Sequence, residues 1–505
     1  MSSILGSWRL AAILLLGVAE SWAAEPNIIY ILADDMGVGD VQVLNPERGK
    51  IQTPHMDRLA EEGMIFTDAH TSSAVCTPTR YGILTGRYNW RTRLQTFVLW
   101  GYSPPLISKE RVTVADFLKE QGYNTAAIGK WHLGMDLPTT DGKPAANNGN
   151  NVDWNGVIED SPFHHGFDYF YGISASLDMP PYIYIENDRF LGEATVKKNF
   201  WKERTGWAEP GFEAVDVLPE IGRKTVEFIR KQKKDTPFFA YVPLTSPHSP
   251  ISVAPEWQGK SGVEPYGDFV MQTDHVIGQI VAAVDEAGFG ENTIIVVTAD
   301  NGCSANPSDY QAMEAKGHYS SAELRGFKSD LWEGGHRVPF IVRWPSVVEA
   351  GSKSDQAICL TDLMATCADI LGTSYPETEG VDSVSFLPAL KGEKIVSTRN
   401  GIVHHGIRGH FAYRQGKWKL LLSKGSGGWT KPTEKDAAAS GAPIAQLYDM
   451  EKDPSETTNL YHSHPEVVAQ LLKQLEEDVA RGRSTAGPVV SNDVDEIVLW
   501  KSGKE

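Results

Sequence analysis

Cysteine is scarce in this chain, which has only four cysteines in 505 residues, Cys76, Cys303, Cys359 and Cys367. So few thiols exclude the class of small secreted folds that a disulfide framework holds together. Cys359 and Cys367 are near enough in sequence to pair, but we expect buried free thiols. The hydrophobic fraction of 41% is ordinary for a globular protein and can supply a core without disulfides. The length favours one large domain with a smaller one.

Long hydrophobic runs are also missing, because no segment after the N-terminus approaches the roughly 20 apolar residues of a membrane span. The first residues carry Arg9, then the short apolar run Leu10–Ala19, then Ser21-Trp22-Ala23. This order predicts an export signal, residues 1–23, with a buried N-terminal helix as the alternative. No cysteine follows the cleavage point, so no lipid anchor is expected there. We therefore expect a periplasmic or secreted protein without a membrane span.

Positive charge is in deficit, since 47 lysines and arginines face 65 acidic residues and the net charge is -18. The predicted signal contains one arginine and one glutamate, so its removal leaves this charge unchanged. Nucleic acid is excluded as a partner, because phosphate binding needs a positive surface. Any anionic substrate must instead be held by cations that gather locally.

What the sequence does contain is an alternation of short apolar runs with helical patterns. Continuous apolar runs of this length are typical of strands buried on both faces of a sheet. We expect such strands at Asn27–Leu32, Asn124–Ile128, Pro237–Leu244, Thr293–Thr298 and Pro339–Val342. Caps and apolar stripes predict helices between them, from Pro54 to Gly63, Thr113 to Gly122, around Ile221–Ile229, and from Phe269 to Gly288. The predicted fold class is α/β, a large mostly parallel sheet sandwiched by helices.

The pattern changes at Gly372–Glu379, a stretch rich in Gly, Pro and Thr that follows a helical pattern over Thr361–Leu371. Behind it come strand-like runs at Gly401–His405, Phe411–Arg414 and Trp418–Leu422, a turn-rich segment Tyr448–Thr458 and an amphipathic helix near Pro465–Val479. These elements predict a smaller C-terminal subdomain with an antiparallel sheet and a helix. The predicted organisation is therefore a signal peptide (1–23), a large α/β domain (24–375) and a C-terminal α+β subdomain (376–505).

Polar side chains follow four of the predicted strands, at the point where each strand ends. They are Asp34 and Asp35, Lys130 and His132, His248, and Asp300 and Asn301. In a parallel sheet the carboxyl ends of the strands meet at one edge, where ligands bind. The acids and the amide offer oxygen ligands, which favour calcium or magnesium over zinc. Paired acids such as Asp34 and Asp35 also serve as helix caps or turn formers. This alternative is less favoured here, because a second polar pair, Asp300 and Asn301, follows another strand.

A further candidate is Cys76, within Cys76-Thr77-Pro78-Thr79-Arg80 and ahead of Leu84-Thr85-Gly86-Arg87. Pro78 places a helix start here, and a helix N-terminus stabilises a thiolate or an oxyanion. From the residues alone, a reactive cysteine and a buried structural thiol remain equally open.

These segments resemble the type I sulfatase family of the alkaline phosphatase-like superfamily. Cys-x-Pro-x-Arg followed by Leu-Thr-Gly-Arg looks like the family signature, and Gly129–Gly134 (GKWHLG) resembles its second signature. The pair Asp34-Asp35, the run Thr298–Gly302 and Gly326-Phe327-Lys328 before Trp332–Gly335 match further motifs in family order. The matches cover about residues 27 to 345, with weaker echoes at Gly416–Leu420 and Leu447–Asp449.

The resemblance implies a role for each matching residue. Asp34, Asp35, Asp300 and Asn301 match the ligands of one divalent cation, usually calcium, and Cys76 matches the cysteine that is oxidised to formylglycine (3-oxoalanine). Arg80, Lys130, His132, His248 and Lys328 match groups that hold the formylglycine hydrate and the sulfate, with His248 as general acid. A formylglycine-generating enzyme is then a partner during maturation.

The resemblance implies a sulfuric ester hydrolase that acts on a sulfated carbohydrate and on aryl sulfates. A phosphonate or phosphate ester hydrolase of the same superfamily is the alternative enzyme. A sugar-binding protein that lost activity is the non-enzymatic alternative, and it predicts a missing catalytic residue, whereas none is missing here. The sugar, the sulfate position and the oligomeric state are not determined by the sequence.

A few other polar and aromatic residues are weaker candidates for substrate contact. Structural hydrogen bonding is the default for the histidines, and packing is the favoured role of the tryptophans. These candidates are His164, His165, His318, Arg325 and His336, and the aromatic residues Trp201, Trp207 and Trp257.

Overall fold

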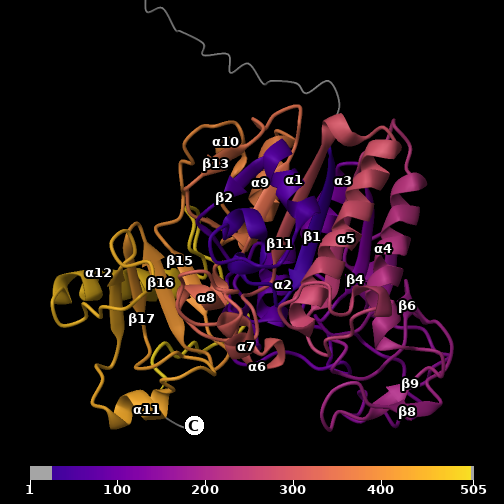
Figure 1. The fold of residues 1–505 in the computed structure, drawn as a ribbon, viewed down its shortest axis with the longest axis horizontal. Coiled ribbons are helices and arrows are strands. Elements are labelled where there is room, and N and C mark those ends of the chain that lie inside the picture. Colours follow the sequence, from indigo (N-terminus) through magenta and orange to yellow (C-terminus); the bar gives the residue numbers. More distant parts are fainter. Residues whose placement is uncertain (1–24, 502–505) are drawn as a thin grey trace, which may run out of the picture.

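The computed structural model describes residues 25–501, so the predicted signal peptide lies outside the described residues. A ten-stranded twisted sheet forms its centre and a smaller sheet lies beside it, with β15, β16 and β17 labelled in Figure 1. The large sheet has the strand order β13 (Ser352–Ser354), β2 (Met64–Phe66), β12 (Phe340–Arg343), β11 (Thr293–Ala299), β1 (Asn27–Asp34), β10 (Phe238–Pro247), β4 (Asn124–Lys130), β5 (Tyr169–Ile173), β6 (Ile185–Glu186), β7 (Arg189–Phe190).

The centre of this sheet confirms the strands expected from the apolar runs. β11, β1, β10, β4 and β5 run parallel to one another, and every residue of β1, β10 and β11 is buried. Antiparallel pairing occurs only toward the edges, where β12 joins β11 and β2, and where β6 joins β5 and β7. The prediction of a mostly parallel sheet is therefore confirmed.

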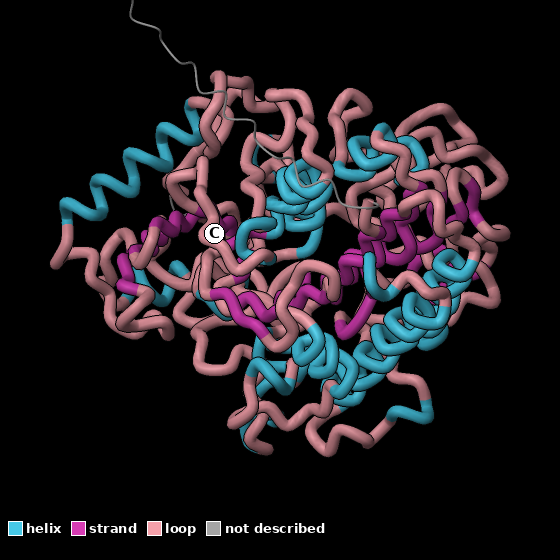
Figure 2. Tube along the Cα trace, turned by 90° about the horizontal axis from the view of Figure 1, so that it is seen from above, coloured by secondary structure: helices cyan, strands magenta, loops and turns pink. Residues whose placement is uncertain are grey.

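Helices cover both faces of the sheet, as Figure 2 shows from above. On one face α4 (Ala214–Arg230) and α5 (Pro265–Glu286) pack on each other and on β10, and α1 (Pro54–Glu62) packs on α5. A second group consists of α2 (Cys76–Thr85), α3 (Val114–Glu120) and α9 (Leu363–Ile370), which contact one another. Short helices lie in the connections: α6 (Ala305–Ser308), α7 (Tyr310–Ala315), α8 (Glu333–His336) and α10 (Leu387–Leu390). Two small two-stranded sheets pair β3 (Ala69–His70) with β14 (Ile358–Cys359) and β8 (Val196–Lys198) with β9 (Gly206–Ala208).

The predicted C-terminal antiparallel sheet is present and has four strands. Its order is β15 (Ile402–His405), β16 (Phe411–Gln415), β17 (Trp418–Leu421) and β18 (Gln446–Asp449), and α12 (Pro465–Ala480) packs on β16 and β17. The prediction of a turn-rich segment over Tyr448–Thr458 is wrong for its first two residues, Tyr448 and Asp449, because they belong to β18, which pairs with β17. α11 (Glu434–Ala439) lies in the loop before β18. The domain boundary at 375/376 stays a prediction.

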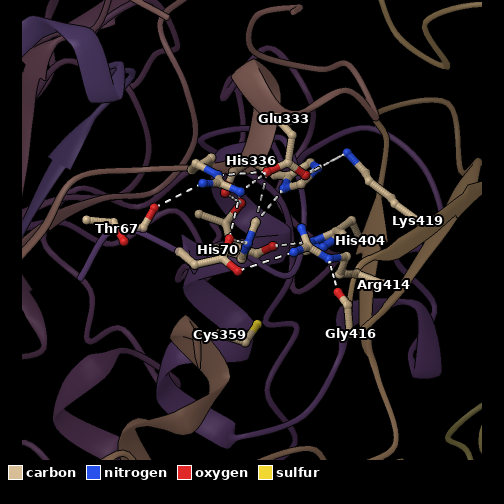
Figure 3. A network of polar contacts seen from close by, with 12 residues as sticks. Thr67, His70, Glu333, His336, Cys359, His404, Arg414, Gly416 and Lys419 are labelled. Carbon is tan, nitrogen blue, oxygen red and sulfur yellow. Dashed lines mark hydrogen bonds and ion pairs between the residues drawn. The ribbon is translucent and has the colours of Figure 1, made fainter. Parts of the chain in front are cut away.

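Buried polar side chains join the small sheet to α8 and β3, as Figure 3 shows. The Lys419 ammonium donates to Glu333 at 2.9 Å, to Glu456 at 2.7 Å and to His336 Nε2 at 2.8 Å. His336 Nδ1 lies 3.1 Å from His70 Nδ1, which leaves His70 Nε2 to donate to Asp68 at 2.7 Å. Burial lowers the pKa of both imidazoles, so they are neutral links in this chain. His336 therefore has the structural role that is the default for a histidine.

Close backbone approach explains one glycine in the core. Gly129 of β4 has φ +138°, and a Cβ there would lie 1.9 Å from the carbonyl oxygen of Pro243 in β10. A side chain is therefore excluded at this position, which lies next to Lys130.

The prediction of buried free thiols at Cys359 and Cys367 is confirmed, and Cys76 and Cys303 are buried without a disulfide as well. Within residues 25–501, no helix combines the length and the apolar character that crossing a membrane requires.

Candidate active site

The polar residues expected at the strand ends do converge at one edge of the large sheet. Asp34 is the last residue of β1 and Lys130 the last residue of β4. His248 follows β10 directly, and Asp300 follows β11. All four strands are neighbours in the sheet and run in the same direction, so their ends place these side chains together.

Three carboxylates form the floor of the site. Oxygens of Asp34, Asp35 and Asp300 all lie within 4.8 Å of one another, and the three side chains are buried. Asn301 donates its amide to Asp35 Oδ1 at 2.8 Å, which leaves Asn301 Oδ1 free of hydrogen bonds among the described residues. Asp34 Oδ1 is likewise buried without a hydrogen-bond partner in residues 25–501.

Each carboxylate has its own cationic neighbour. Lys130 contacts Asp34 at 2.5 Å, and Lys328 contacts Asp35 at 2.5 Å. Arg80 donates to Asp300 Oδ2 from Nε at 3.0 Å and from Nη2 at 2.7 Å. Arg80 comes from α2 and Lys328 from the loop before α8, so segments distant in sequence complete the site. The net charge of -18 is thus offset locally, as anion binding requires.

The charges in this cluster change one another's pKa values. Burial opposes the ionisation of Asp34, but Lys130, His248 and Arg80 outweigh it and hold the pKa of Asp34 well below its usual range. Burial together with the charge of Asp34 raises the pKa of Asp300 to about 7. The two carboxylates therefore repel each other despite their cations, and a divalent cation between them would relieve that repulsion.

The donor set fits a hard cation. Three carboxylates and one amide oxygen supply only oxygen ligands, and two of these oxygens, on Asp34 and Asn301, accept no hydrogen bond from the described residues. Calcium takes six to eight such oxygens, whereas zinc prefers nitrogen or sulfur. Asp34, Asp35, Asp300 and Asn301 are therefore the residues that would hold the ion.

Cys76 lies beside this cluster, at the first position of α2. Its sulfur is within 4.8 Å of an Asp34 oxygen and a His248 ring nitrogen, and the residue is only 3% exposed. Arg80 lies one turn further along the same face of the helix. Burial raises the pKa of the Cys76 thiol despite Lys130 and Lys328. The thiol is thus protonated at neutral pH, and the helix N-terminus does not convert it into a thiolate.

His132 has one ring nitrogen available for proton transfer. Its Nε2 pairs with the Leu99 carbonyl at 2.8 Å, and its Nδ1 has no partner among the described residues although it is buried. The Leu99 amide donates to Thr77, the residue after Cys76, which connects His132 to the start of α2. Burial, Lys130 and Arg80 lower the pKa of His132, so the ring is neutral.

His248 is oriented by its own loop and by the segment after β5. Its Nδ1 contacts the Ser249 carbonyl at 2.6 Å and Ser176 Oγ at 3.1 Å. The other nitrogen, Nε2, lies 3.6 Å from Asp35 Oδ2. A protonated His248 would thus keep one N–H on Ser249 and direct the other toward the carboxylates.

Backbone strain occurs at three positions in or beside this site. Asp35 has φ +66° and His132 has φ +59°, and Ser329, next to Lys328, has φ +84°. Non-glycine residues adopt such angles at a cost, and they cluster at functional sites where the surrounding structure holds them.

A pocket of about 590 Å³ borders the cluster of carboxylates and cations. Asp35, His248 and Lys328 form its inner end. Its remaining walls include residues that the sequence analysis missed, because they lie in irregular segments without a strand-end signal: Asp178, Lys202, Arg204, Trp429 and Lys431. The volume is in the range of sites that enclose a small organic ligand.

Of the weaker sequence candidates, only two line this pocket. Trp201 and Arg325 contribute to its wall. His318 is buried and bonded to Asp40 at 2.8 Å, and His165 is bonded to Asp160 at 2.6 Å. The rest, His164, His336, Trp207 and Trp257, do not line it either.

Comparison with known proteins agrees with this geometry. The sequence model of the family described as Sulfatase matches residues 26–373. N-acetylgalactosamine-6-O-sulfatase of Bacteroides thetaiotaomicron is 35% identical over 492 residues, which cover 90% of this chain and 93% of that protein. Arylsulfatase A of Bos taurus is 32% identical, covering 93% of this chain and 90% of the relative.

A solved structure, described under the metabolism of multiple glycosaminoglycans by Bacteroides thetaiotaomicron, has the same fold. Its TM-score is 0.78 at 34% identity, and the match covers 90% of this chain and 99% of the other. The segment that matches the family model contains the signature motifs, and it also contains the four strands whose ends meet at the site. The chain belongs to the sulfatase family and is a sulfuric ester hydrolase.

Proposed function

We propose that this sulfatase is exported and removes sulfate from a sulfated saccharide, using a formylglycine formed from Cys76 and one calcium ion. The observation that carries the proposal is the position of Cys76 at the start of α2, within reach of Asp34 and His248. A formylglycine-generating enzyme would then act on the chain during maturation. A periplasmic or secreted location follows from the predicted signal peptide.

The substrate class rests on the relatives and on the pocket. One relative is named for action on the 6-O-sulfate of N-acetylgalactosamine, and it is similar over nearly the whole chain. A sugar 6-sulfate on an amino sugar is therefore the first substrate to test. The pocket wall offers indole rings and polar groups, which are the usual contacts of a sugar ring.

The first half of the proposed reaction is attack on sulfur. The aldehyde of formylglycine would add water to give two geminal hydroxyls. One hydroxyl would give its proton to a neighbouring carboxylate, and its oxygen would form the new S–O bond while the bond from sulfur to the leaving alcohol breaks. Lys130, Lys328 and Arg80 stabilise charge on the sulfate oxygens. Protonated His248 gives its Nε2 proton to the leaving oxygen. A bound calcium ion would supply charge stabilisation at this site and lower the pKa of the hydroxyl.

The second half releases sulfate. The remaining hydroxyl of the sulfated hydrate loses its proton to His132 Nδ1, the acceptor that has no other partner among the described residues. Its oxygen then forms the C=O bond of the aldehyde while the C–O bond to sulfate breaks. A serine or cysteine ester lacks this second hydroxyl and would need water to attack.

Turnover of an aryl sulfate and of the matching phosphate monoester tests the reaction class. We expect the sulfate to be hydrolysed with the higher kcat/KM. A preference for the phosphate or phosphonate ester would favour the alternative enzyme of the same superfamily.

Removal of the metal should lower turnover by on the order of tenfold or more, because the ion stabilises charge in the transition state. After treatment with EDTA, calcium should restore turnover better than zinc, since every ligand is an oxygen. Calcium should also raise Tm, as a ligand of the folded state does. Asp34→Asn should weaken both effects, and Asp153→Asn, a matched change of a loop carboxylate away from the cluster, should not. Full activity in protein shown by elemental analysis to lack metal would contradict this assignment.

Loss of the His248 side chain should matter most when the leaving alcohol is poor, because general acid catalysis acts on the leaving oxygen. His248→Ala should therefore reduce kcat for a sugar sulfate by roughly 100-fold, and by much less for an activated aryl sulfate. Ser176→Ala, which removes a contact to Nδ1, should give a smaller change of the same kind. Equal losses on both substrates would assign His248 to binding only.

A further inference from the structure

The outer part of the catalytic pocket is cationic although the protein as a whole is acidic. Beyond the catalytic residues, its wall contains one carboxylate, Asp178, and four cations, Lys202, Arg204, Arg325 and Lys431. This local excess of positive charge is opposite in sign to the net charge of -18. Local cations of this kind attract and hold an anionic group.

Most of these cations have no carboxylate partner. Arg204 is paired with Asp178. Arg325 donates to the Glu456 carbonyl at 2.9 Å and stacks on Trp332 at 3.7 Å, and neither contact neutralises its charge. Lys202 and Lys431 are exposed and form no ion pair with the described residues. Three positive charges on the pocket wall are thus available to a ligand.

Aromatic side chains lie beside these charges. Trp201 and Trp429 line the same pocket, and Trp429 is 50% exposed. Arg204 lies over the ring of Trp100, which is 53% exposed, at 4.9 Å. An indole offers a large apolar face and a polar N–H, and tryptophan is enriched at binding interfaces. Together with the cations they form a surface suited to a saccharide that carries negative charge.

This outer surface is fixed relative to the sulfate site. The Trp429 amide contacts Ser329 Oγ at 2.9 Å and Asp330 Oδ1 at 3.1 Å, and both residues follow Lys328 directly. Lys431 is two residues beyond Trp429, so the cations of the outer pocket begin close to Lys328, the proposed sulfate-binding lysine. Asp178 is 5% exposed, and its Oδ1 has no hydrogen-bond partner among the described residues. This oxygen can therefore accept a hydrogen bond from a hydroxyl or amide of the sugar that lies between the sulfate site and the outer cations.

We propose that the outer pocket, formed by Lys202, Arg325, Lys431 and the indoles of Trp201 and Trp429, is a subsite for a second anionic group of the substrate. This group, a carboxylate or a second sulfate, is carried by the saccharide unit next to the sugar that is desulfated. The inference rests on the proposed sulfatase reaction on saccharides and extends it, because it makes the preferred substrate a polyanionic chain fragment rather than a neutral oligosaccharide with a single sulfate.

Binding to full-length calcium-loaded Cys76→Ala protein tests the subsite without turnover. Three disaccharides share one sulfated hexosamine and differ in the neighbouring unit: a uronate, the same unit with its carboxylate reduced to an alcohol, and a sulfated neutral sugar. By calorimetry we expect both charged neighbours to lower Kd about tenfold relative to the reduced one, at low salt. The two charged arms identify which anion the subsite prefers.

A charge-removing pair of substitutions provides the direct comparison. Lys202→Gln with Lys431→Gln should bring the three Kd values within about threefold of one another. The matched control, Lys233→Gln with Lys353→Gln, removes two exposed lysines that do not line the pocket and should leave the tenfold ratio unchanged. Equal Kd values for the charged and reduced disaccharides in the parent protein would overturn the subsite, as would an unchanged ratio in the pocket variant. Aryl sulfate turnover by protein with intact Cys76 reports separately on the proposed reaction.

Discussion

Protein with Cys76 replaced by alanine should fold normally and show no measurable turnover of sulfate esters. The side chain at this position would supply both the attacking oxygen and the hydroxyl that later expels sulfate. The raised pKa of the thiol argues that unmodified Cys76 is not the nucleophile at neutral pH. Active protein should therefore contain formylglycine, and the tryptic peptide with residue 76 should lose sulfur and two hydrogens and gain one oxygen.

Two comparisons make this result specific. Cys76→Ser should at best accumulate a slowly hydrolysed sulfate ester, because it can attack but lacks the second hydroxyl. Cys367→Ala, another buried free cysteine, should keep its activity, since Cys367 lies in α9 and does not line the catalytic pocket. If peptide mass spectrometry found only unmodified Cys76 in a preparation with full turnover, the proposed mechanism would be wrong.

Replacement of Lys328 by alanine should lower kcat/KM for sulfate esters by roughly 100-fold or more, as the loss of a charge-stabilising donor commonly does. Burial disfavours the ammonium, but Asp35 and the other acidic groups outweigh it and raise the pKa of Lys328 above its ordinary value. Its charge is therefore permanent across the working pH range. In the reaction the Lys328 ammonium would contact the sulfate oxygens. Its contact with Asp35 would then weaken, because Asp35 would also bind the metal ion.

Lys328→Met separates charge from packing, because it keeps most of the length of the side chain. It should lose as much activity as Lys328→Ala while its Tm stays closer to that of the parent. Lys316→Met, at a partly exposed lysine paired with Glu264, is the matched control and should retain full activity. A folded Lys328→Met variant with near-parental turnover would remove Lys328 from the proposed site.

Local sequence determined much of this protein. The continuous apolar runs of β1, β10 and β11 predict strands buried on both faces, and they are found there because such runs have no polar face to expose to water. Parallel direction then brings the strand ends to one edge. For this reason the order of apolar runs and polar residues along the chain is enough to group Asp34, Lys130, His248 and Asp300.

Tertiary structure alone decided which charges pair and what forms the pocket. The positions of these residues along the sequence do not predict that Lys130 contacts Asp34 or that Lys328 contacts Asp35. These contacts depend on how the loops cross the edge of the sheet. The same is true of Asp178, Arg204 and Trp429, which lie in irregular segments. Their positions follow from long-range packing, which leaves no periodic pattern in the local sequence. Lys419 is a further case, since it lies on β17 of the small sheet yet donates to Glu333 of α8.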